Sequence, residues 1–491
     1  MRPHLALAAL VLACQPQAPQ VVVDCPDIKL RPATEVPDTA ATPPAPQRPE
    51  RFDIAAIDAY LAAQTAHKGF VGLSVAVVRN GELVLAKGYG KADLTTDTLV
   101  DERTAFGIGS VSKQFTCAAA LLLAEDGRLS LQDKVGKHYP DLTRASDITI
   151  DNLLSHTAGY PDYYPLDFVD ARMSNPIAPD DLIKQYASGP LDFDPGTRYS
   201  YSNTGFVIAG RMVEKISGTS FAEFLQQRIF TPLAMKSAAL APPASTANLA
   251  TGYTTFSLGP PIPAAPEAAG WVGAAGALVM TPTDLATWDL ALMQGTLFKN
   301  PTTIKTMTTP RTLTSGEPID YACGLAVARR QGETVVSHTG AVSGFLAWNA
   351  MIPRTKSAVI LVTNADFVDG NGLHGELLSL LIDADKPIPK ITGDSPRDVA
   401  LALLRQYQSG DVDRTALGEP FSDFLTPEKL KEAAPRLAAL GDPSSIVIER
   451  LGERGGMEVA TLRVVFPTRS ARASLYRTPD GKIQQFLLLR D

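Results

Sequence analysis

The alternation of apolar and polar residues predicts a helix, a hairpin and a second helix in the first part of the chain. Apolar side chains recur at helical spacing over residues 53–66, and residues 70–79 form the continuous apolar run of a buried strand. An Asn-Gly pair at 80–81 predicts a two-residue turn, so we expect residues 82–89 to return as the second strand. Residues 110–126 are apolar almost all round at helical spacing, which is typical of a buried helix.

The middle of the chain predicts helices separated by Pro- and Gly-rich loops, and the pattern after Tyr321 returns to strands. The predicted helices are 131–140, 150–155, 180–186, 204–216, 221–230 and 283–293. The predicted strands are 324–330, 334–338, 345–352 and 358–364, followed by a closing helix over 372–382. Strands thus come from both ends of this region. We therefore expect an α+β fold in which helices flank an antiparallel sheet and a helical subdomain is inserted.

A second, smaller unit follows a Pro-containing linker at residues 387–395. Residues 396–408, with Ser395 as the cap, and residues 427–440 predict helices. Alternating segments at 445–450, 459–466, 471–477 and 482–489 predict four strands. Residues 396–491 are therefore expected to form a small α+β domain of normal size.

The N-terminus predicts export. Residues 1–13 are typical of a signal peptide, because Arg2 precedes a short apolar run over residues 5–13. Residues 11–14, Val-Leu-Ala-Cys, resemble a bacterial lipoprotein cleavage box, which implies lipidation and membrane anchoring at Cys14. Residues 14–50 are rich in proline and predict an extended tether before a domain over 51–386. We expect a bacterial cell-envelope protein of the periplasm, anchored as a lipoprotein, with secretion as the alternative.

Composition excludes several other classes. The 491 residues are 45% hydrophobic and 20% charged, which is typical of a soluble globular protein, and the net charge of −7 gives no support for a nucleic-acid partner. Four cysteines do not make a disulfide framework, and we interpret Cys117 and Cys323 as small buried residues rather than a redox pair. The six histidines show no metal-ligand spacing. We expect no metal and no cofactor, and the sequence leaves the oligomeric state open.

The candidate chemistry begins in the 110–126 helix. Ser110 lies near its start, where a hydroxyl is a natural cap, and Lys113 lies three residues on, so the two share a helical face. A lysine in apolar surroundings loses its proton more easily, and a neutral amine beside a serine hydroxyl forms a base and nucleophile pair. A capping serine followed by a lysine on an exposed face would need no function, so the pair requires support from elsewhere in the chain.

Three other stretches supply that support. Tyr199-Ser-Tyr201-Ser-Asn203 offers a tyrosine that can act as a base if cations favour its phenolate, and an asparagine that can orient a substrate amide. His338-Thr-Gly340-Ala341 ends a predicted strand, where glycine permits close approach and the next amide can serve an oxyanion. The third stretch, 153–159 (Leu-Leu-Ser-His-Thr-Ala-Gly), reads as a helix end with a structural role.

In this order and spacing, the four stretches resemble the motifs of the class C-like serine β-lactamase family, which also holds D,D-peptidases, D-aminopeptidases and esterases. The resemblance covers roughly residues 51–385. It implies a penicillin-recognising serine hydrolase fold with Ser110 as nucleophile, Lys113 as its base partner and Tyr201 as proton relay. It further implies that Asn203, His338 and Gly340 bind the substrate. The backbone amides of Ser110 and Ala341 would form the oxyanion hole.

One departure from the family pattern bears on the substrate. True β-lactamases begin the third motif with lysine, which helps to hold the β-lactam carboxylate, whereas this chain has His338, which is only partly charged at neutral pH unless perturbed. We therefore favour an esterase or a D-amino-acid peptidase over an efficient β-lactamase. A penicillin-binding sensor or slow-deacylating binding protein is the alternative. An α/β-hydrolase is set aside because no Gly-x-Ser-x-Gly pentapeptide occurs.

The C-terminal unit also resembles a known class of domain. Its helix-then-sheet pattern and the Asp-Gly-Lys-Ile run at 480–483 are similar to the cone-shaped nuclear-transport-factor-like domains appended to some of these hydrolases. We assign it no catalytic residue.

Overall fold

The computed structural model describes residues 46–240, 248–384 and 388–490. The predicted signal peptide, Cys14 and most of the predicted tether lie outside the described residues, so these stay predictions. In the described ranges, no helix is both long enough and apolar enough to cross a bilayer.

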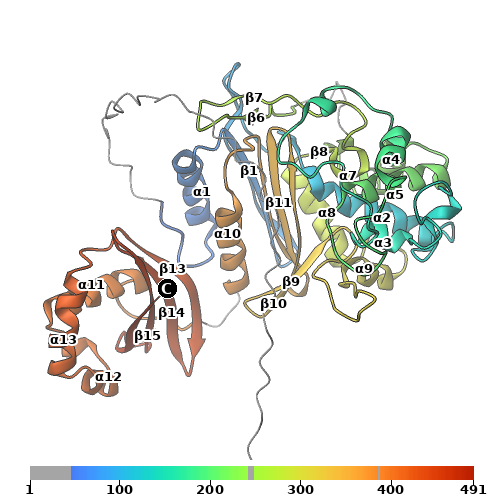
Figure 1. Cartoon of the computed structure of the whole chain (residues 1–491). Helices are drawn as coiled ribbons and strands as arrows, with labels where there is room; N and C mark the ends of the chain where they lie inside the picture. The colour runs from blue at the N-terminus through green and yellow to red at the C-terminus, as the bar shows by residue number, and fades with distance from the viewer. Residues whose placement is uncertain (1–45, 241–247, 385–387, 491) are drawn as a thin grey trace, which may run out of the picture. The chain divides into compact units, whose positions relative to one another are not determined.

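An antiparallel sheet forms the centre of the larger unit (Figure 1). In the described part of the chain its strand order is β3-β2-β1-β12-β11-β10-β9. The central pair joins β1 (Gly72–Arg79) to β12 (Ser357–Thr363), with Val75 opposite Leu361. The other strands are β2 (Glu82–Asp93), β3 (Thr98–Leu99), β9 (Ala326–Arg330), β10 (Glu333–Val342) and β11 (Phe345–Ile352). The predicted hairpin and the assembly of the sheet from both ends of the domain are confirmed.

Helices cover both faces of this sheet because β1 and β12 alternate their buried side chains between two cores (Figure 1). Val75 and Leu361 point to the core shared with α1 (Ile54–Lys68) and α10 (Asn371–Asp383). Their neighbours Ala76, Ile360 and Val362 point to the core shared with α2 (Lys113–Glu125) and α8 (Pro282–Gln294). This arrangement confirms the predicted fold class.

The helical region lies on the α2 side of the sheet (Figure 1). Besides α2 and α8 it contains α3 (Ile150–Leu154), α4 (Pro179–Ala187), α5 (Asn203–Ser217), α6 (Phe221–Leu225), α7 (Gly273–Gly276) and α9 (Pro301–Thr308). Short strands form two further sheets in the described residues: β4 (Phe106–Gly107), β8 (Leu278–Met280) and β5 (Ala239–Leu240) pair in that order, and β6 (Tyr253–Thr254) pairs with β7 (Ile262–Pro263).

One helix prediction was wrong. Residues 131–140 form only a 3₁₀ turn at Val135–Lys137. The backbone N–H of Val135 donates to Ile148 and that of Gly136 donates to Ala145, so tertiary partners replace the helical ones.

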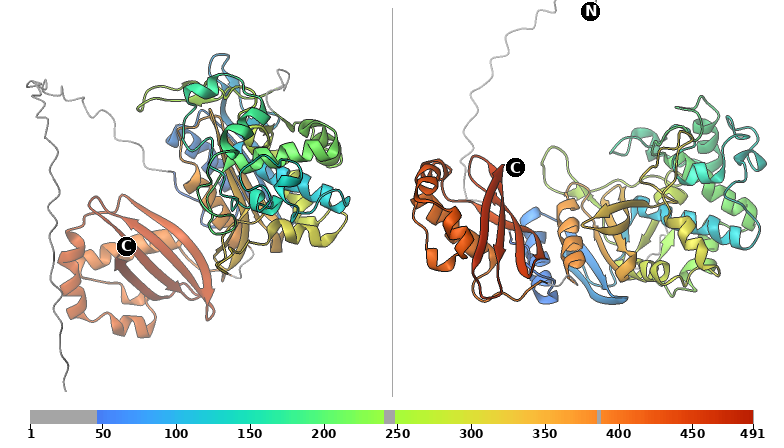
Figure 2. Two further views of the ribbon diagram at one scale, coloured as in Figure 1. Left: turned by 45° about the vertical axis from the view of Figure 1, so that its right-hand side comes forward. Right: turned by 90° about the horizontal axis from the view of Figure 1, so that it is seen from below.

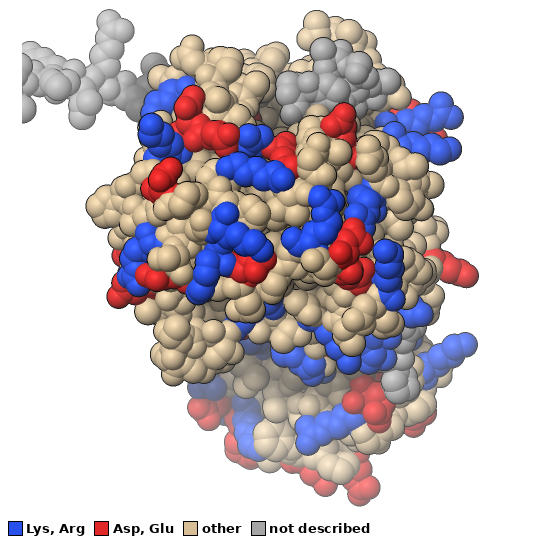
Figure 3. Space-filling view, turned by 90° about the vertical axis from the view of Figure 1, so that its right-hand side faces the viewer, with Lys and Arg blue, Asp and Glu red and all other residues tan. Residues whose placement is uncertain are grey.

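Charges of both signs are intermingled over the face of the helical region shown in Figure 3. Ion pairs of the helical region include Arg211 with Asp180, Arg144 with Asp147 and Arg228 with Asp126. In this view, basic residues lie among acidic ones.

The C-terminal unit has its own core and its own four described strands, in the order β13-β14-β15-β16 (Figure 2). The strands are Ser445–Arg454, Met457–Val465, Ser470–Arg477 and Ile483–Arg490, and they follow helices α11 (Pro396–Ser409), α12 (Glu419–Phe424) and α13 (Pro427–Ala438). Ser395 caps α11 by accepting from the N–H of Asp398. The predicted helix-then-sheet order is confirmed, whereas the nuclear-transport-factor-like resemblance stays a prediction.

The interpretation of two cysteines needs correction. Cys117 on α2 and Cys323 before β9 are both fully buried, as expected, but they form a disulfide with each other. They are 206 residues apart in sequence, and only the packing of α2 against the segment that enters β9 brings them together. A cysteine count cannot reveal such a pair. The disulfide closes a long loop, and a crosslink of this kind stabilises mainly by restricting the unfolded chain.

Replacing Cys323 by serine is expected to lower the free energy of unfolding by about 2–4 kcal/mol, because the unfolded chain regains the entropy of that loop. Urea denaturation of both proteins, each with and without reductant, measures the effect. Reduced wild type should approach the variant. Alkylation of both Cys117 and Cys323 in unfolded but unreduced protein, read by peptide mass spectrometry, would contradict the prediction.

Candidate active site

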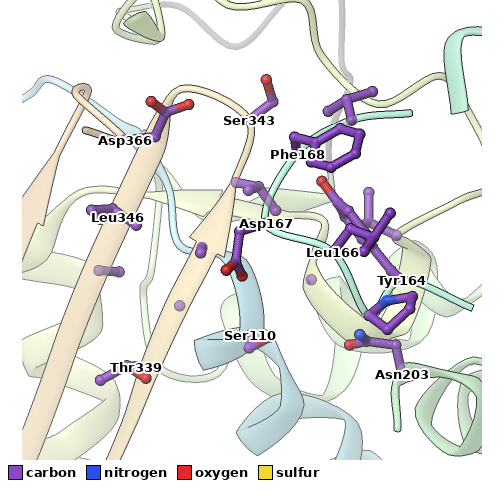
Figure 4. A pocket seen from close by; sticks show the side chains of 18 of the residues that line it. Ser110, Tyr164, Leu166, Asp167, Phe168, Asn203, Thr339, Ser343, Leu346 and Asp366 are labelled. Carbon is purple, nitrogen blue, oxygen red and sulfur yellow. The ribbon is translucent and has the colours of Figure 1, made fainter. Parts of the chain in front are cut away.

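Ser110 lies in a 3₁₀ turn, Gly109–Ser112, that leads directly into α2. Its side chain does not cap the helix, so the predicted capping role is wrong. Ser110 lines a cavity of about 1590 Å³, and Figure 4 shows it at the floor of that cavity, beside the strand that carries Thr339.

Two glycines allow the Ser110 turn and β10 to touch backbone to backbone. Gly109 has φ +50°, and a Cβ there would lie 2.5 Å from the amide nitrogen of Ala341. A Cβ on Gly340 would lie 2.0 Å from the carbonyl oxygen of Ile108 and 3.0 Å from the amide nitrogen of Ser110. The contact brings the amide-bearing backbone at Ser110 and Ala341 together at the cavity, where the sequence predicted an oxyanion hole.

Lys113 is fully buried behind Ser110. Its Nζ lies 2.9 Å from Ser110 Oγ, and it donates to Asn203 Oδ1 at 2.7 Å and to the carbonyl oxygen of Ala275 at 2.7 Å. Burial lowers the pKa of the Lys113 ammonium to about 7, although the Asp162 carboxylate opposes that shift. An amine that has lost one proton keeps its two donor bonds to Asn203 and Ala275 and directs a lone pair at the Ser110 hydroxyl.

Tyr201 is held against this pair. The Lys113 Nζ lies 4.9 Å from the centre of the phenol ring. Burial raises the pKa of Tyr201, and a hydrogen bond with Ser110 only partly opposes that rise. The sequence allowed a phenolate only if nearby cations favour it; here burial dominates, and Tyr201 stays a phenol that can pass a proton on.

The stretch 153–159 has the structural role that the sequence predicted. The imidazole of His156 is buried and packs against the Tyr201 ring, with ring centres 4.1 Å apart. Its Nδ1 accepts the backbone N–H of Ser202 at 3.0 Å. Burial, with Lys113 and His338 nearby, holds the pKa of His156 well below its usual value, so this imidazole is neutral.

Asn203 is the first residue of α5 and lines the cavity. Its Oδ1 accepts from Lys113, and its Nδ2 lies 3.2 Å from each Asp162 carboxylate oxygen. The Asn203 backbone N–H also donates to Asp162, at 3.1 Å. Both ends of the Asn203 side-chain amide thus have protein partners. The predicted binding of substrate by Asn203 stays a prediction. Sequence reasoning missed Asp162, since a carboxylate in a Tyr- and Pro-rich loop gives no spacing signal.

His338 lines the cavity in a neutral form. Burial and the nearby Lys113 charge lower the pKa of His338 to about 3. Its Nδ1 lies 2.5 Å from the carbonyl oxygen of Thr339, which can only accept, so Nδ1 carries the proton. Its Nε2 therefore accepts from the Tyr321 hydroxyl at 2.9 Å. The sequence expected a partial charge unless the surroundings perturb the ring; burial is that perturbation, and it leaves His338 neutral with both ring nitrogens bound to protein groups.

The described residues bring together every predicted member of the site: Ser110, Lys113, Tyr201, Asn203, His338, Gly340 and Ala341. Their roles stay predictions at this point. Across the described ranges, no three His, Cys, Asp or Glu side chains gather as metal ligands would.

Comparison with known proteins identifies the family. The family model described as "Beta-lactamase" matches residues 57–382. The D-aminopeptidase of Brucella abortus is 31% identical over 315 residues, which are 63% of this chain and 60% of that protein. That of Brucella anthropi is 29% identical over 299 residues, 60% of this chain and 56% of that protein. The chain thus spans about three fifths of the length of these relatives.

Two solved structures show the same fold. An octameric penicillin-binding protein homologue from Pyrococcus abyssi has a TM-score of 0.58 at 20% identity, covering 89% of this chain and 100% of that one. A D-amino acid amidase from Ochrobactrum anthropi has a TM-score of 0.57 at 23% identity, covering 67% of this chain and 98% of that one. With its family model matching well over half of its length, this chain belongs to the beta-lactamase family.

Proposed function

We propose that the chain is a serine hydrolase that cleaves an amide or ester bond through an acyl-Ser110 intermediate. The observation that carries this proposal is the buried Lys113 amine, which has a pKa of about 7 and lies 2.9 Å from the Ser110 hydroxyl. An amine with that pKa is substantially unprotonated at neutral pH and can act as a general base.

In the first half-reaction, the Ser110 hydroxyl proton passes to Lys113 as Oγ attacks the substrate carbonyl carbon. The electron pair of the carbonyl moves to its oxygen, where the backbone amides of Ser110 and Ala341 stabilise the negative charge. When the tetrahedral intermediate collapses, the bond to the leaving group breaks. The proton held by Lys113 travels through the Tyr201 phenol to the leaving nitrogen or oxygen.

In the second half-reaction, water takes the place of the leaving group. The Lys113 and Tyr201 pair accepts a proton from this water as it attacks the acyl carbon. Collapse releases the carboxylic acid and returns the proton to Ser110. Asp162 and His156 act indirectly, since the first holds Asn203 against Lys113 and the second packs against the Tyr201 ring.

The substrate is an amide or ester in preference to a β-lactam. His338 stands where β-lactamases have lysine, and its ring is neutral with both nitrogens used. The curated relatives are named D-aminopeptidases, which supports an amide substrate. A penicillin-binding sensor would show one burst of acylation without steady turnover, and such a result would replace the hydrolase by this alternative.

Replacing Ser110 by alanine should abolish turnover of p-nitrophenyl esters, because the nucleophile is lost. Replacing Lys113 by alanine should lower kcat/KM at least about 1,000-fold, because the base and its proton path are lost together. Labelling with a fluorophosphonate, read by peptide mass spectrometry, should place the adduct on Ser110 of the wild type. Alanine at the exposed Ser146 is the matched control. An unlabelled Ser110 in active enzyme would disprove the assignment.

The pH profile of kcat/KM should rise as pH increases through about 7, because Lys113 must lose its proton to act as base. Asp162 raises the pKa of Lys113, so replacing Asp162 by asparagine should move this rise to lower pH. Steady-state kinetics across buffers of constant ionic strength measure both effects. A profile that is flat from pH 6 to 9 would show that Lys113 is not the base.

Replacing Gly340 by alanine should lower kcat/KM about 100-fold, because the added Cβ would lie 2.0 Å from the carbonyl oxygen of Ile108 and force apart the backbones that form the oxyanion hole. Alanine at Gly189, where a Cβ meets nothing within 4 Å, is the control. Thermal denaturation of both variants separates loss of activity from loss of fold. Wild-type kcat/KM in a folded Gly340→Ala variant would contradict the proposed geometry.

A further inference from the structure

The wall of the catalytic cavity is strongly acidic. Among the described residues that line it are five aspartates and neither a lysine nor an arginine; the aspartates are Asp162, Asp167, Asp192, Asp366 and Asp369. A cleft lined by charges of one sign concentrates ions of the opposite sign. The cavity therefore favours a positively charged substrate and disfavours one that carries a carboxylate.

The nearby basic groups do not offset this charge. Lys113 lies behind Ser110, where Asn203 and the Ala275 carbonyl occupy its N–H donors. His338 is neutral and donates its one ring proton to the Thr339 carbonyl. Neither group offers a free cationic donor to a substrate carboxylate.

Asp167 differs from most of the acidic side chains around it. Asp162 accepts from Asn203, Asp366 from the N–H of Gly344, and Asp369 from the N–H of Asn371. Asp167 is exposed to solvent, and its side chain forms neither a hydrogen bond nor an ion pair with the residues that the structure describes. Figure 4 shows its carboxylate pointing into the cavity on the side that faces Ser110.

The surroundings of Asp167 suit a substrate with both an apolar group and a charge. Its neighbours Leu166 and Phe168 line the same cavity, although 45% and 61% of their surfaces are exposed. Trp348 lines it from β11. A substrate that carries an ammonium next to an apolar group could therefore contact both a carboxylate and apolar side chains in this cavity.

We propose that Asp167 selects the substrate by binding a protonated amine that lies close to the scissile carbonyl. The substrate class is then an amide or ester of an amine-bearing molecule, such as an amino-acid amide or a peptide with a free amino terminus. The inference rests on the proposed hydrolase activity at Ser110 and adds to it the residue and the charge that decide which molecules enter.

The test uses three p-nitroanilides that differ in one substituent next to the carbonyl: phenylalanyl as both enantiomers, 3-phenylpropionyl and benzylmalonyl. These place an ammonium, a hydrogen or a carboxylate at that carbon. The wild type should prefer the ammonium substrate and discriminate against the carboxylate. In the Asp167→Asn variant, the ratio of kcat/KM for the ammonium and hydrogen substrates should fall about tenfold, as expected for one partly solvated ion pair.

Asp141→Asn is the matched control, because Asp141 is exposed and does not line the cavity. This variant should keep the wild-type ratio.

A second pair of substrates, the 3-phenylpropionyl amides of 1,2-diaminoethane and n-propylamine, places the ammonium on the leaving group instead. A preference that depends on Asp167 in either pair supports the inference, and the pair that shows it tells on which side of the bond the ammonium binds.

Two outcomes overturn the inference: a wild type with no preference for ammonium in either pair, or a preference that Asp167→Asn leaves unchanged. If that variant does not fold, the wild-type ratio should still fall as NaCl rises from about 0.05 to 0.5 M, and a constant ratio would count as refutation. Failure of the hydrolase proposal looks different. In that case no substrate is turned over and the fluorophosphonate leaves Ser110 unlabelled.

Discussion

Removal of the Lys113 amine from water is the constraint on which the rest of the site depends. A lysine on the surface of α2 would remain an ammonium, but this one is fully buried and its pKa falls to about 7. Its two carbonyl partners come from α5 and α7, far away in sequence from α2. The helical region therefore does more than cover the sheet, because it supplies the acceptors that make a buried amine tolerable.

The second requirement is close approach between the Ser110 turn and β10. Gly109 and Gly340 meet the opposing backbone where no side chain would fit. β10 pairs with β11 in the sheet whose central strands, β1 and β12, come from the two ends of the domain. The sheet therefore fixes the position of the Ala341 amide. The fold and the site are thus coupled: the helices hold Lys113, and the sheet holds the Ala341 amide, one of the two proposed to face the substrate oxygen.

Sequence reasoning found the groups whose types and order carry a strong signal. Ser110, Lys113, Tyr201 and the His338 strand follow a pattern of four motifs, and alternation and turn residues predicted the strands. It failed where tertiary contacts decide. The sequence left the protonation of Tyr201 conditional on nearby cations, and burial keeps it a phenol. The Tyr321 hydroxyl and the Thr339 carbonyl take both ring nitrogens of His338, which no sequence pattern shows. Loop carboxylates such as Asp162 and Asp167 have no periodicity, and the Cys117–Cys323 pair becomes visible only when α2 packs against the segment before β9.

The most direct test of this account is a titration of Lys113 itself. In protein labelled with ¹⁵N at lysine Nζ, the Lys113 signal can be assigned from its loss in the Lys113→Arg variant and followed against pH. The account predicts a midpoint at about 7, well below the ordinary lysine value of 10.5. A Lys113 amine that stays protonated up to pH 9–10 would contradict it, because Ser110 would then lack a base at neutral pH.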